Sequence, residues 1–274
     1  MEIIKSIFLG IIEGITEWLP ISSTGHLILL EPLINFNLSE EFVAMFRVVI
    51  QLGAILAVLV IYFKELWPFT RNKSSCFVKK DTIGLWLKII IACVPATVIG
   101  LFLDDWLDKN FYNYNTVSIM LIVIGMLFII IDRNREYKIN KMEQITNKDA
   151  FIIGIWQVLA LIPGTSRSGA TIIGGLLLGI DRPLIAQFTF YLGIPIMFGA
   201  SVLKLIKYFI MGQVLTGEEF EVLIVGMATA FLVSIFAIKF IVGYVKTHDF
   251  KIFGKYRIAL GTIVCVISCL NIIS

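Results

Sequence analysis

The chain of 274 residues is 58% hydrophobic, and only 16% of its residues are charged. Soluble domains carry about 25% charged residues, so this composition excludes an ordinary soluble globular protein. Apolar runs of about 20 residues, long enough to cross a bilayer as helices, recur along the whole chain. The net charge of +3 says little by itself, and no nucleic-acid partner is expected. The sequence therefore predicts an all-α integral membrane protein that crosses the membrane several times.

The first apolar segment, residues 1–33, is broken near its middle. Pro20 and the cluster ISSTGH interrupt it. A broken helix at membrane depth is tolerated only where its freed backbone groups face protein or a water-filled cavity. We therefore expect residues 1–33 to form a re-entrant hairpin, which enters and leaves the membrane on one side and lines a polar pocket.

Three uninterrupted apolar segments follow, and three more close the chain. The six predicted spans are residues 41–63, 83–103, 115–131, 184–211, 220–243 and 256–273. Between the two sets lies a second broken segment, 149–180, where Pro163 and the cluster GTSRSG interrupt the apolar run. This segment is expected to form a second re-entrant hairpin.

The charges of the connecting segments support six spans and two hairpins. Basic residues gather in segments 64–82, 132–149 and 244–257, and the positive-inside rule makes these segments cytoplasmic. Basic and acidic connections alternate along the chain, and all basic connections lie on one side of the membrane only if both hairpins re-enter. Both termini then lie outside. The basic residues are Lys64, Arg71, Lys73, Lys79, Lys80, Arg133, Arg135, Lys138, Lys141, Lys148, Lys246, Lys251, Lys255 and Arg257. Acids occupy the intervening connections, as Asp104, Asp105 and Asp108 in one and Glu218, Glu219 and Glu221 in the other.

The two halves of the chain, residues 1–131 and 149–274, resemble each other. GIIEGITEWLPISSTGH and GIWQVLALIPGTSRSGAT share a Gly, an acid or amide, an apolar stretch, a Pro, a hydroxyl cluster and a Gly, with a one-residue slip. The similar stretches IQLGAILA (50–57) and FYLGIPIMFGA (190–200) follow them. Each half holds one hairpin and an odd number of spans, so the second half must lie upside down. This predicts an inverted-topology repeat in one membrane domain, with the two hairpin tips meeting near the midplane.

Two glutamates lie inside the first broken segment. Glu13 and Glu17 are spaced i, i+4, so they share one helix face. Ionisable groups within a membrane cost at least about 2.5 kcal/mol each and are functional candidates by default. The alternative is a structural pair in which one acid is protonated and bonds neighbouring backbone.

Hydroxyl residues precede a new helix in both broken segments. Ser22, Ser23 and Thr24 precede a helix expected to begin near His26. Hydroxyl residues at a helix start are commonly N-caps, but the cluster around Arg167 opens a helix in the same way. Two helix N-termini with free N–H groups and a guanidinium would then point at one place, and this combination binds phosphate. Arg167 could also balance Glu13 or Glu17 before an anion arrives.

The acids need their own explanation, because carboxylates repel phosphate. Either a divalent cation, Mg²⁺ or Ca²⁺, bridges carboxylate and phosphate oxygens, or one acid serves as general acid or base. Acids, a histidine, hydroxyls and an arginine together predict phosphoryl transfer or hydrolysis. Arg47 and Gln51 could point into the same pocket, as could Gln157 and Gln187, although hydrogen bonding between helices is an equal interpretation for the glutamines.

EGITEWLPISSTGH (13–26) and PGTSRSGAT (163–171) resemble the two signature regions of the bacterial undecaprenyl-diphosphatase family of the bacitracin-resistance type. The similarity covers nearly the whole chain. It implies a hydrolase in the bacterial plasma membrane that converts undecaprenyl diphosphate to undecaprenyl phosphate and inorganic phosphate. That reaction recycles the lipid carrier of peptidoglycan synthesis and confers resistance to bacitracin. The resemblance also implies a divalent cation, a polyprenyl diphosphate as the lipid substrate, and a site open to the outer face.

The resemblance assigns residues as well. The family's essential residues match Glu13, Glu17, Ser23, His26 and Arg167 here. Glu13 and Glu17 are the candidate cation ligands. Ser23 is the candidate nucleophile, with Glu17 or His26 taking its proton, and attack by water with either residue as base is the rival. The candidate phosphate-binding residues are Ser22, Thr24, Gly25, Ser166, Ser168, Gly169 and Thr171.

Two other functional classes remain open. The inverted repeat and the broken helices are also typical of a transporter or lipid flippase, acting instead of hydrolysis or in addition to it. A non-enzymatic protein that binds lipids or anions is the third class. A homodimer is compatible with the sequence, and membrane lipids are expected to surround the chain.

Overall fold

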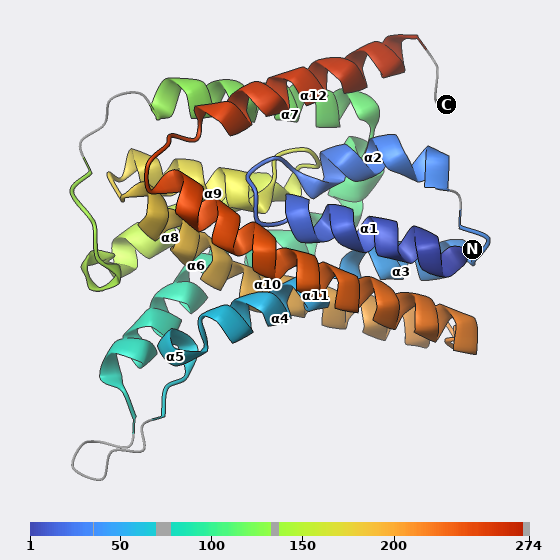
Figure 1. Ribbon diagram of the computed structural model, residues 1–274, viewed down its shortest axis with the longest axis horizontal. Helices are drawn as coiled ribbons and strands as arrows, with labels where there is room; N and C mark the ends of the chain where they lie inside the picture. Colours follow the sequence, from blue (N-terminus) through green and yellow to red (C-terminus); the bar gives the residue numbers. More distant parts are fainter. Residues whose placement is uncertain (35, 70–77, 133–136, 271–274) are drawn as a thin grey trace.

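The computed structural model describes residues 1–34, 36–69, 78–132 and 137–270, and helices make up most of this part of the chain (Figure 1). Six membrane-length helices are present among these residues, which confirms the predicted fold class. Five are α6 (Lys80–Phe111), α7 (Tyr114–Ile131), α10 (Arg182–Ile210), α11 (Gly217–Val245) and α12 (Lys251–Cys269). The sixth, Glu40–Ile61, consists of α3 (Glu40–Val49) and α4 (Gln51–Ile61), separated at Ile50.

The two remaining apolar segments are broken where the sequence predicts. α1 (Glu2–Thr16) and α2 (Ser23–Ile34) are separated by a turn that contains Pro20. α8 (Asn147–Val158) is followed by the 3-10 turn η2 (Leu159–Leu161), a loop and α9 (Arg167–Leu177). Two short elements, α5 (Phe63–Leu66) and η1 (Met142–Gln144), lie in the connections. That each broken pair re-enters the membrane on one side stays a prediction.

Several helix boundaries differ from the sequence prediction, among them those of α6, α12 and α2. α6 continues to Phe111, so most of the predicted acidic connection is helical, and it ends just before Asn113, whose side chain caps α7 by accepting from Thr116 N at 2.9 Å. α12 begins at Lys251, five residues before the predicted start of that span at 256. α2 begins at Ser23 rather than near His26. In each case a charged or polar stretch was taken for a loop although it continues a helix.

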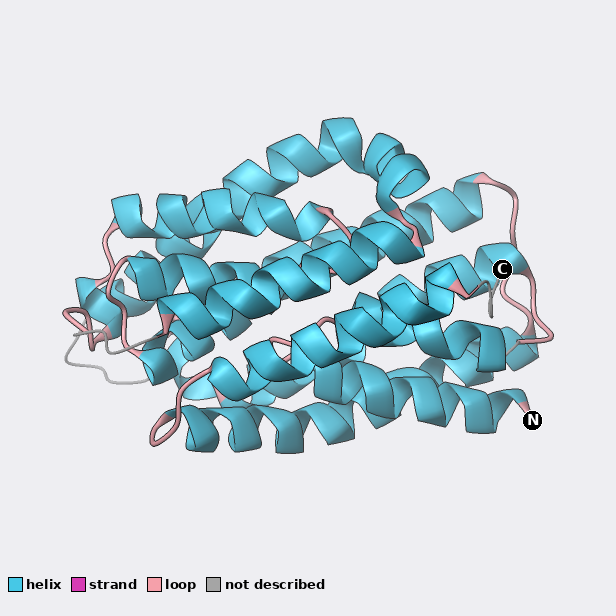
Figure 2. Ribbon diagram, turned by 90° about the horizontal axis from the view of Figure 1, so that it is seen from above, coloured by secondary structure: helices cyan, strands magenta, loops and turns pink. Residues whose placement is uncertain are grey.

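Helices from the two halves of the chain pack against each other. α1 lies along α11, α8 along α6, and α7 along α12, whereas α10 contacts α3, α4 and α9 near the centre (Figures 1 and 2). Glycines permit the close approaches that are typical of membrane helices. A Cβ on Gly125 would lie 2.7 Å from Gly254 O, and one on Gly154 would lie 2.4 Å from Ala92 O. The breaks in α1–α2 and α8–α9 are thereby brought into the middle of the bundle.

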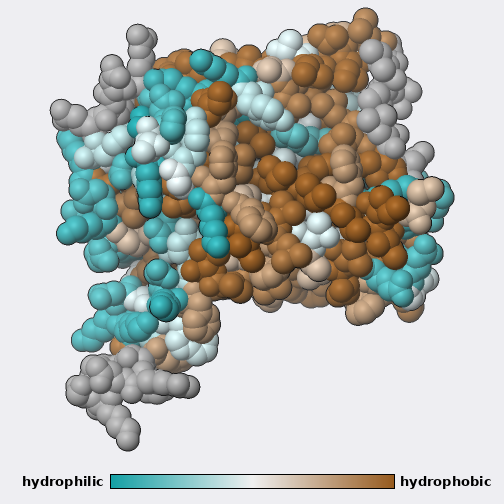
Figure 3. Space-filling view, in the orientation of Figure 1, coloured by the Kyte–Doolittle hydropathy of each residue, from teal (hydrophilic) through white to brown (hydrophobic). Residues whose placement is uncertain are grey.

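The surface is apolar across the middle of the face seen in Figure 3, and hydrophilic side chains gather mainly toward the two ends. α1 begins and α12 ends at the right-hand end in Figure 1, whereas the connections α7–α8 and α11–α12 lie at the opposite end. Four of the basic residues used in the topology argument, Arg71, Lys73, Arg133 and Arg135, lie outside the described residues. This distribution fits a protein that crosses a membrane several times.

Candidate active site

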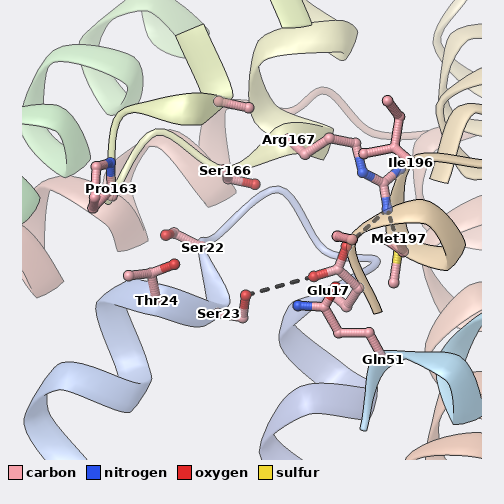
Figure 4. Close-up of a pocket in the computed structure, with 13 residues that line it drawn as sticks. Glu17, Ser22, Ser23, Thr24, Gln51, Pro163, Ser166, Arg167, Ile196 and Met197 are labelled. Carbon is pink, nitrogen blue, oxygen red and sulfur yellow. Dashed lines mark hydrogen bonds and ion pairs between the residues drawn. The ribbon is translucent and has the colours of Figure 1, made fainter. Parts of the chain in front are cut away.

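The two broken segments meet around one cavity of about 180 Å³ (Figure 4). Glu17 reaches it from the turn after α1, and Arg167 reaches it from the first turn of α9. The expectation that the two polar clusters share a pocket is thus met by the geometry. The lining residues are Glu17, Ser22, Ser23, Thr24, Gln51, Ala160, Pro163, Gly164, Ser166, Arg167, Ile196, Met197 and Ala200.

Ser22 and Ser166 give both clusters the same backbone shape. They have φ angles of 72° and 70°, and among the described residues they are the only non-glycine residues with positive φ. Each hydroxyl accepts from the backbone three residues on, from Gly25 N at 3.3 Å and from Gly169 N at 3.1 Å. A non-glycine residue in this region is strained, and such strain clusters at functional sites. The two turns aim the N-termini of α2 and α9 at the cavity.

The two caps use backbone groups of two predicted phosphate-binding residues. Gly25 and Gly169 are predicted to bind phosphate, and in the structure their N–H groups donate to the hydroxyls of Ser22 and Ser166. Neither glycine lines the cavity. The N–H groups of the preceding residues in each first turn have no acceptor within their own helix, and these can attract an anion.

Glu17 is held by both segments at once (Figure 4). Arg167 Nη2 donates to Glu17 Oε1 at 2.7 Å, and Ser23 Oγ donates to Glu17 Oε2 at 3.5 Å. Ser23 directly follows Ser22 as Arg167 directly follows Ser166, so the two partners of Glu17 occupy the same position in the two clusters. The side chains of Glu17 and Arg167 are 11% and 10% exposed, and both line the cavity.

Helix α10 fixes the guanidinium of Arg167. Arg167 Nη1 donates to Thr189 O at 2.6 Å, and Nη2 lies 3.0 Å from the sulfur of Met197. The ring of Trp18 lies 5.6 Å from the guanidinium carbon, which adds a cation–π contact. A Cβ on Gly193 would lie 2.6 Å from Arg167 Nη2, so any larger residue at that position would displace the guanidinium.

Glu13 lies one turn before Glu17 and is 1% exposed. Neither of its carboxylate oxygens accepts a hydrogen bond from a residue that the structure describes, although Glu17 is close enough to interact with it electrostatically. Hard oxygen atoms without a donor are suitable ligands for Mg²⁺ or Ca²⁺. Among the described residues, no three His, Cys, Asp or Glu side chains lie together so that they could hold a metal ion by themselves. Glu13 and Glu17 could therefore supply two oxygen ligands to such a cation, and Mg²⁺ commonly keeps several water ligands.

The structure does not place His26 in the cavity. Its Nδ1 lies 2.7 Å from Ser22 O, and its Nε2 lies 2.7 Å from the hydroxyl of Tyr256. The imidazole stacks on Tyr256, with ring centroids 5.6 Å apart. Since His26 lies one helical turn after Ser22, its side chain turns toward α12 rather than toward Glu17. Its role as a base stays a prediction.

Two of the predicted phosphate-binding hydroxyls also point elsewhere. Ser168 Oγ contacts Glu17 O at 3.3 Å, and Thr171 Oγ1 lies 2.9 Å from Thr189 Oγ1 and 3.0 Å from Arg167 O. Both are buried, and neither lines the cavity. Ser168 ties the two motif segments together, while Thr171 supports the region that holds Arg167. Ser22, Thr24 and Ser166 are the predicted hydroxyls of this group that do line the cavity.

The amide side chains divide between the site and structural roles. Gln51 lines the cavity, but Arg47 is not among the lining residues. Gln157 donates to Ala92 O at 3.3 Å, which is the helix-to-helix bond weighed as the alternative. Gln187 donates to the Tyr191 hydroxyl at 2.5 Å and lines a separate cavity of about 580 Å³.

Sequence reasoning missed four residues around the site. Thr189 and Met197 give no sequence signal, because one acts through its backbone carbonyl and the other through a thioether. Gly193 belongs to the repeated LG pair of segments 50–57 and 190–200, which could have identified it. Arg257 was counted with the basic residues of a cytoplasmic connection, but it is fully buried. The early start of α12 places it inside the bundle.

Comparison with known proteins identifies the family of this chain. The family model of the bacitracin resistance protein BacA matches residues 6–263. An undecaprenyl-diphosphatase of Desulfitobacterium hafniense is 57% identical over 268 residues, which cover 96% of this chain and 95% of the relative. Undecaprenyl-diphosphatases of Streptococcus thermophilus and Enterococcus faecalis are 54% and 52% identical, over 100% and 98% of this chain and 96% and 98% of the relatives. The chain therefore belongs to the bacitracin resistance protein BacA family.

Proposed function

We propose that this protein hydrolyses undecaprenyl diphosphate to undecaprenyl phosphate and inorganic phosphate. It thereby returns the lipid carrier to peptidoglycan synthesis and confers resistance to bacitracin. The observation that carries the proposal is the Glu17 carboxylate, which contacts a hydroxyl on one oxygen and a guanidinium on the other. The proposal assigns the hydroxyl as nucleophile, the carboxylate as base and the guanidinium as phosphate ligand. The names of the relatives support the choice of lipid.

Ser23 is the proposed nucleophile. Its Oγ attacks the terminal phosphorus, its proton passes to Glu17 Oε2, and the bond to the bridging oxygen breaks, so undecaprenyl phosphate leaves. Water then hydrolyses the phosphoserine and releases inorganic phosphate. Arg167 and the N-termini of α2 and α9 stabilise the charge on the transferred and leaving phosphates. The rival route is direct attack by water with Glu17 as the base.

Glu13 and Glu17 would hold a divalent cation, Mg²⁺ or Ca²⁺. When bound, such a cation supplies positive charge to the diphosphate oxygens. Glu13 supports this assignment, because no donor from the described residues satisfies its buried oxygens.

The isoprenoid tail would lie between helices in the bacterial plasma membrane, with the diphosphate in the cavity. Both termini and the opening of the site would face the outside. The arrangement of the ends supports this orientation, because α1 begins and α12 ends opposite to the basic connections α7–α8 and α11–α12 (Figure 1), and basic connections stay in the cytoplasm.

The decisive experiment measures phosphate release from undecaprenyl diphosphate by the purified protein, with and without a chelator. Wild-type protein should release phosphate, and the chelator should abolish release until Mg²⁺ or Ca²⁺ is restored. Glu17→Gln should reduce kcat at least about 100-fold, because a general base contributes 10²–10⁴-fold. Glu221→Gln makes the same chemical change at an exposed position and should leave kcat unchanged. Phosphate release by Glu17→Gln at the wild-type rate would exclude the proposed site.

A further inference from the structure

Arg257 is a fully buried arginine that no step of the proposed reaction uses. It lies in the second turn of α12 and is 0% exposed. Its Nη1 donates to Pro20 O at 3.3 Å, and its Nη2 donates to Gly164 O at 2.7 Å and Thr165 O at 2.9 Å. One guanidinium therefore joins the loop before α2 to the loop before α9.

The buried guanidinium of Arg257 is unusual because it has no acidic partner among the described residues. Among the described residues Arg257 forms no ion pair, whereas Arg167 pairs with Glu17 and Arg182 pairs with Asp132. Burying a charge without an acid is costly unless hydrogen bonds compensate. All three compensating acceptors are backbone carbonyls of the two loops. The burial cost is thus offset only when both loops are in place.

The bonded carbonyls lie next to the residues that shape the site. Pro20 precedes Ser22 by two residues, and Thr165 directly precedes Ser166. Ser22 and Ser166 are the two strained serines that set the directions of α2 and α9. A shift of either loop would move Ser23 or Arg167, and each contacts a different oxygen of Glu17.

We propose that Arg257 is a positioning residue, which fixes the spacing of the two motif loops and thereby holds Ser23 and Arg167 on the same carboxylate. The inference rests on the proposed function for its kinetic consequence. Arginine is required because its planar, forked donors reach both loops at once, whereas the single ammonium of lysine cannot reproduce that fork.

The test compares Arg257→Lys and Arg257→Met with Lys255→Gln, a change at an exposed residue two positions earlier in α12. Positioning predicts that kcat for undecaprenyl diphosphate falls about 10²-fold in both Arg257 variants, because misplacement by about 1 Å can cost that much. KM should change by less than about threefold, since Arg257 does not line the cavity. Its loss therefore removes no contact that binds the substrate equally in the ground state and the transition state. The control variant should keep both constants.

Hydrogen–deuterium exchange of the same proteins in detergent gives a second measurement that needs no activity. Arg257→Lys should speed exchange in segments 17–26 and 162–170 together, with unchanged exchange in α6 and α11. An effect on only one loop, an equal effect throughout the chain, or a rise in KM with unchanged kcat would overturn the proposal.

The two measurements also separate this inference from the proposed function. If wild-type protein releases no phosphate, the proposed function fails, while coupled exchange in the two loops still decides whether Arg257 joins them. If Arg257→Met does not fold, Arg257→Lys keeps the charge and some of the hydrogen bonds, and its thermal unfolding midpoint shows whether the comparison is made on folded protein. Wild-type exchange and kcat in folded Arg257→Lys would refute the positioning role.

Discussion

Ser23 and Arg167 contact different oxygens of the Glu17 carboxylate, and this arrangement determines what the substitution of each residue should do. Ser23 contacts Oε2 at 3.5 Å, and Arg167 contacts Oε1 at 2.7 Å. The serine contact is the longer one, so its hydroxyl can turn toward phosphorus without breaking the ion pair. The arginine contact is short and charge-assisted, which holds the carboxylate of Glu17 in place.

Ser23→Ala tests the covalent route. Without the hydroxyl no phosphoserine can form, so phosphate release should fall at least about 10³-fold if Ser23 is the nucleophile. Rapid quenching of wild-type protein with labelled undecaprenyl diphosphate, followed by peptide mass spectrometry, should show phosphate on Ser23. Near-wild-type activity of Ser23→Ala would instead establish direct attack by water.

Gly193→Ala tests the requirement for space beside Arg167. The new Cβ would lie 2.6 Å from Arg167 Nη2, so the guanidinium must move away from Glu17. Phosphate release should fall about 10-fold or more, because small displacements of a positioned group are costly. Gly199→Ala in the same helix α10 meets no atom within 4 Å and should be neutral. Equal activities of the two variants, measured with undecaprenyl diphosphate, would contradict the tight placement of Arg167.

At the scale of the element, the two serine turns explain why broken helices are stable here. Each serine caps its helix, which satisfies one of the free N–H groups of the first turn. The same residues adopt the left-handed backbone region, which glycine adopts without strain. Capping and backbone strain therefore act in opposite directions at Ser22 and Ser166.

Ser166→Gly and Ser166→Ala separate these two effects. Both remove the cap, but alanine retains the strained backbone and glycine relieves it. A lost N-cap costs about 1 kcal/mol with alanine and only a few tenths with glycine, so the alanine variant should unfold at a lower temperature than the glycine variant. Thermal unfolding in detergent measures the order. The reverse order would show that neither cap nor backbone strain controls this turn.

Element types were predictable from the sequence because hydropathy decides them. Six long apolar runs became six membrane-length helices, and each Pro with its hydroxyl cluster became a break. Boundaries were less predictable, because charged residues can continue a helix when one face is buried. Lys251 and Lys255 made the start of α12 look like a loop, yet Phe253, Gly254 and Arg257 on the same turns are buried.

The candidate site was predictable in part for a similar reason. Glu17, Ser23 and Arg167 are polar residues in apolar surroundings, and the sequence shows that contrast directly. The direction of a side chain on its helix was not visible, so His26 and Thr171 were expected in the cavity although they point to Tyr256 and Thr189. Backbone carbonyls that act as acceptors leave no sequence signal at all.

At the scale of the whole molecule, a buried carboxylate joins three parts of the fold at the end with the basic connections. Asp132 is 0% exposed and lies 2.9 Å from Arg182 Nη2. It also accepts from the hydroxyl of Tyr137 at 2.8 Å and from Phe250 N at 2.7 Å. Burial raises the pKa of Tyr137, and the bond to Asp132 raises it further, so Tyr137 remains a donor at neutral pH. The carboxylate thus connects α7 with the starts of α10 and α12.

Asp132→Ala should destabilise the fold without touching the cavity. Removing one partner of a buried ion pair costs about 3–5 kcal/mol, so the thermal unfolding midpoint should fall strongly, while kcat per folded molecule should stay near the wild-type value. Asp249→Asn is the control, because its pair with Lys251 is about one-third exposed, and such pairs contribute about 1 kcal/mol or less. Similar midpoints for the two variants would contradict this account.

The inverted repeat stays a prediction, and the helix contacts support it. α1 packs on α11 and α8 packs on α6, while α7 packs on α12. If the two halves are exchanged, the first two contacts replace each other and the third is unchanged, as a pseudo-two-fold axis requires. The chemistry does not follow that symmetry, since the position of Ser23 in one cluster is held by Arg167 in the other.

The sharing of Glu17 between Ser23 and Arg167 has a genetic consequence. If the gene were divided at the connection between α7 and α8, one fragment would encode the acid and the hydroxyl, and the other would encode the guanidinium. Neither polypeptide alone could restore bacitracin tolerance to a deficient bacterium, whereas co-expression of the two could do so by reassembly in the bilayer.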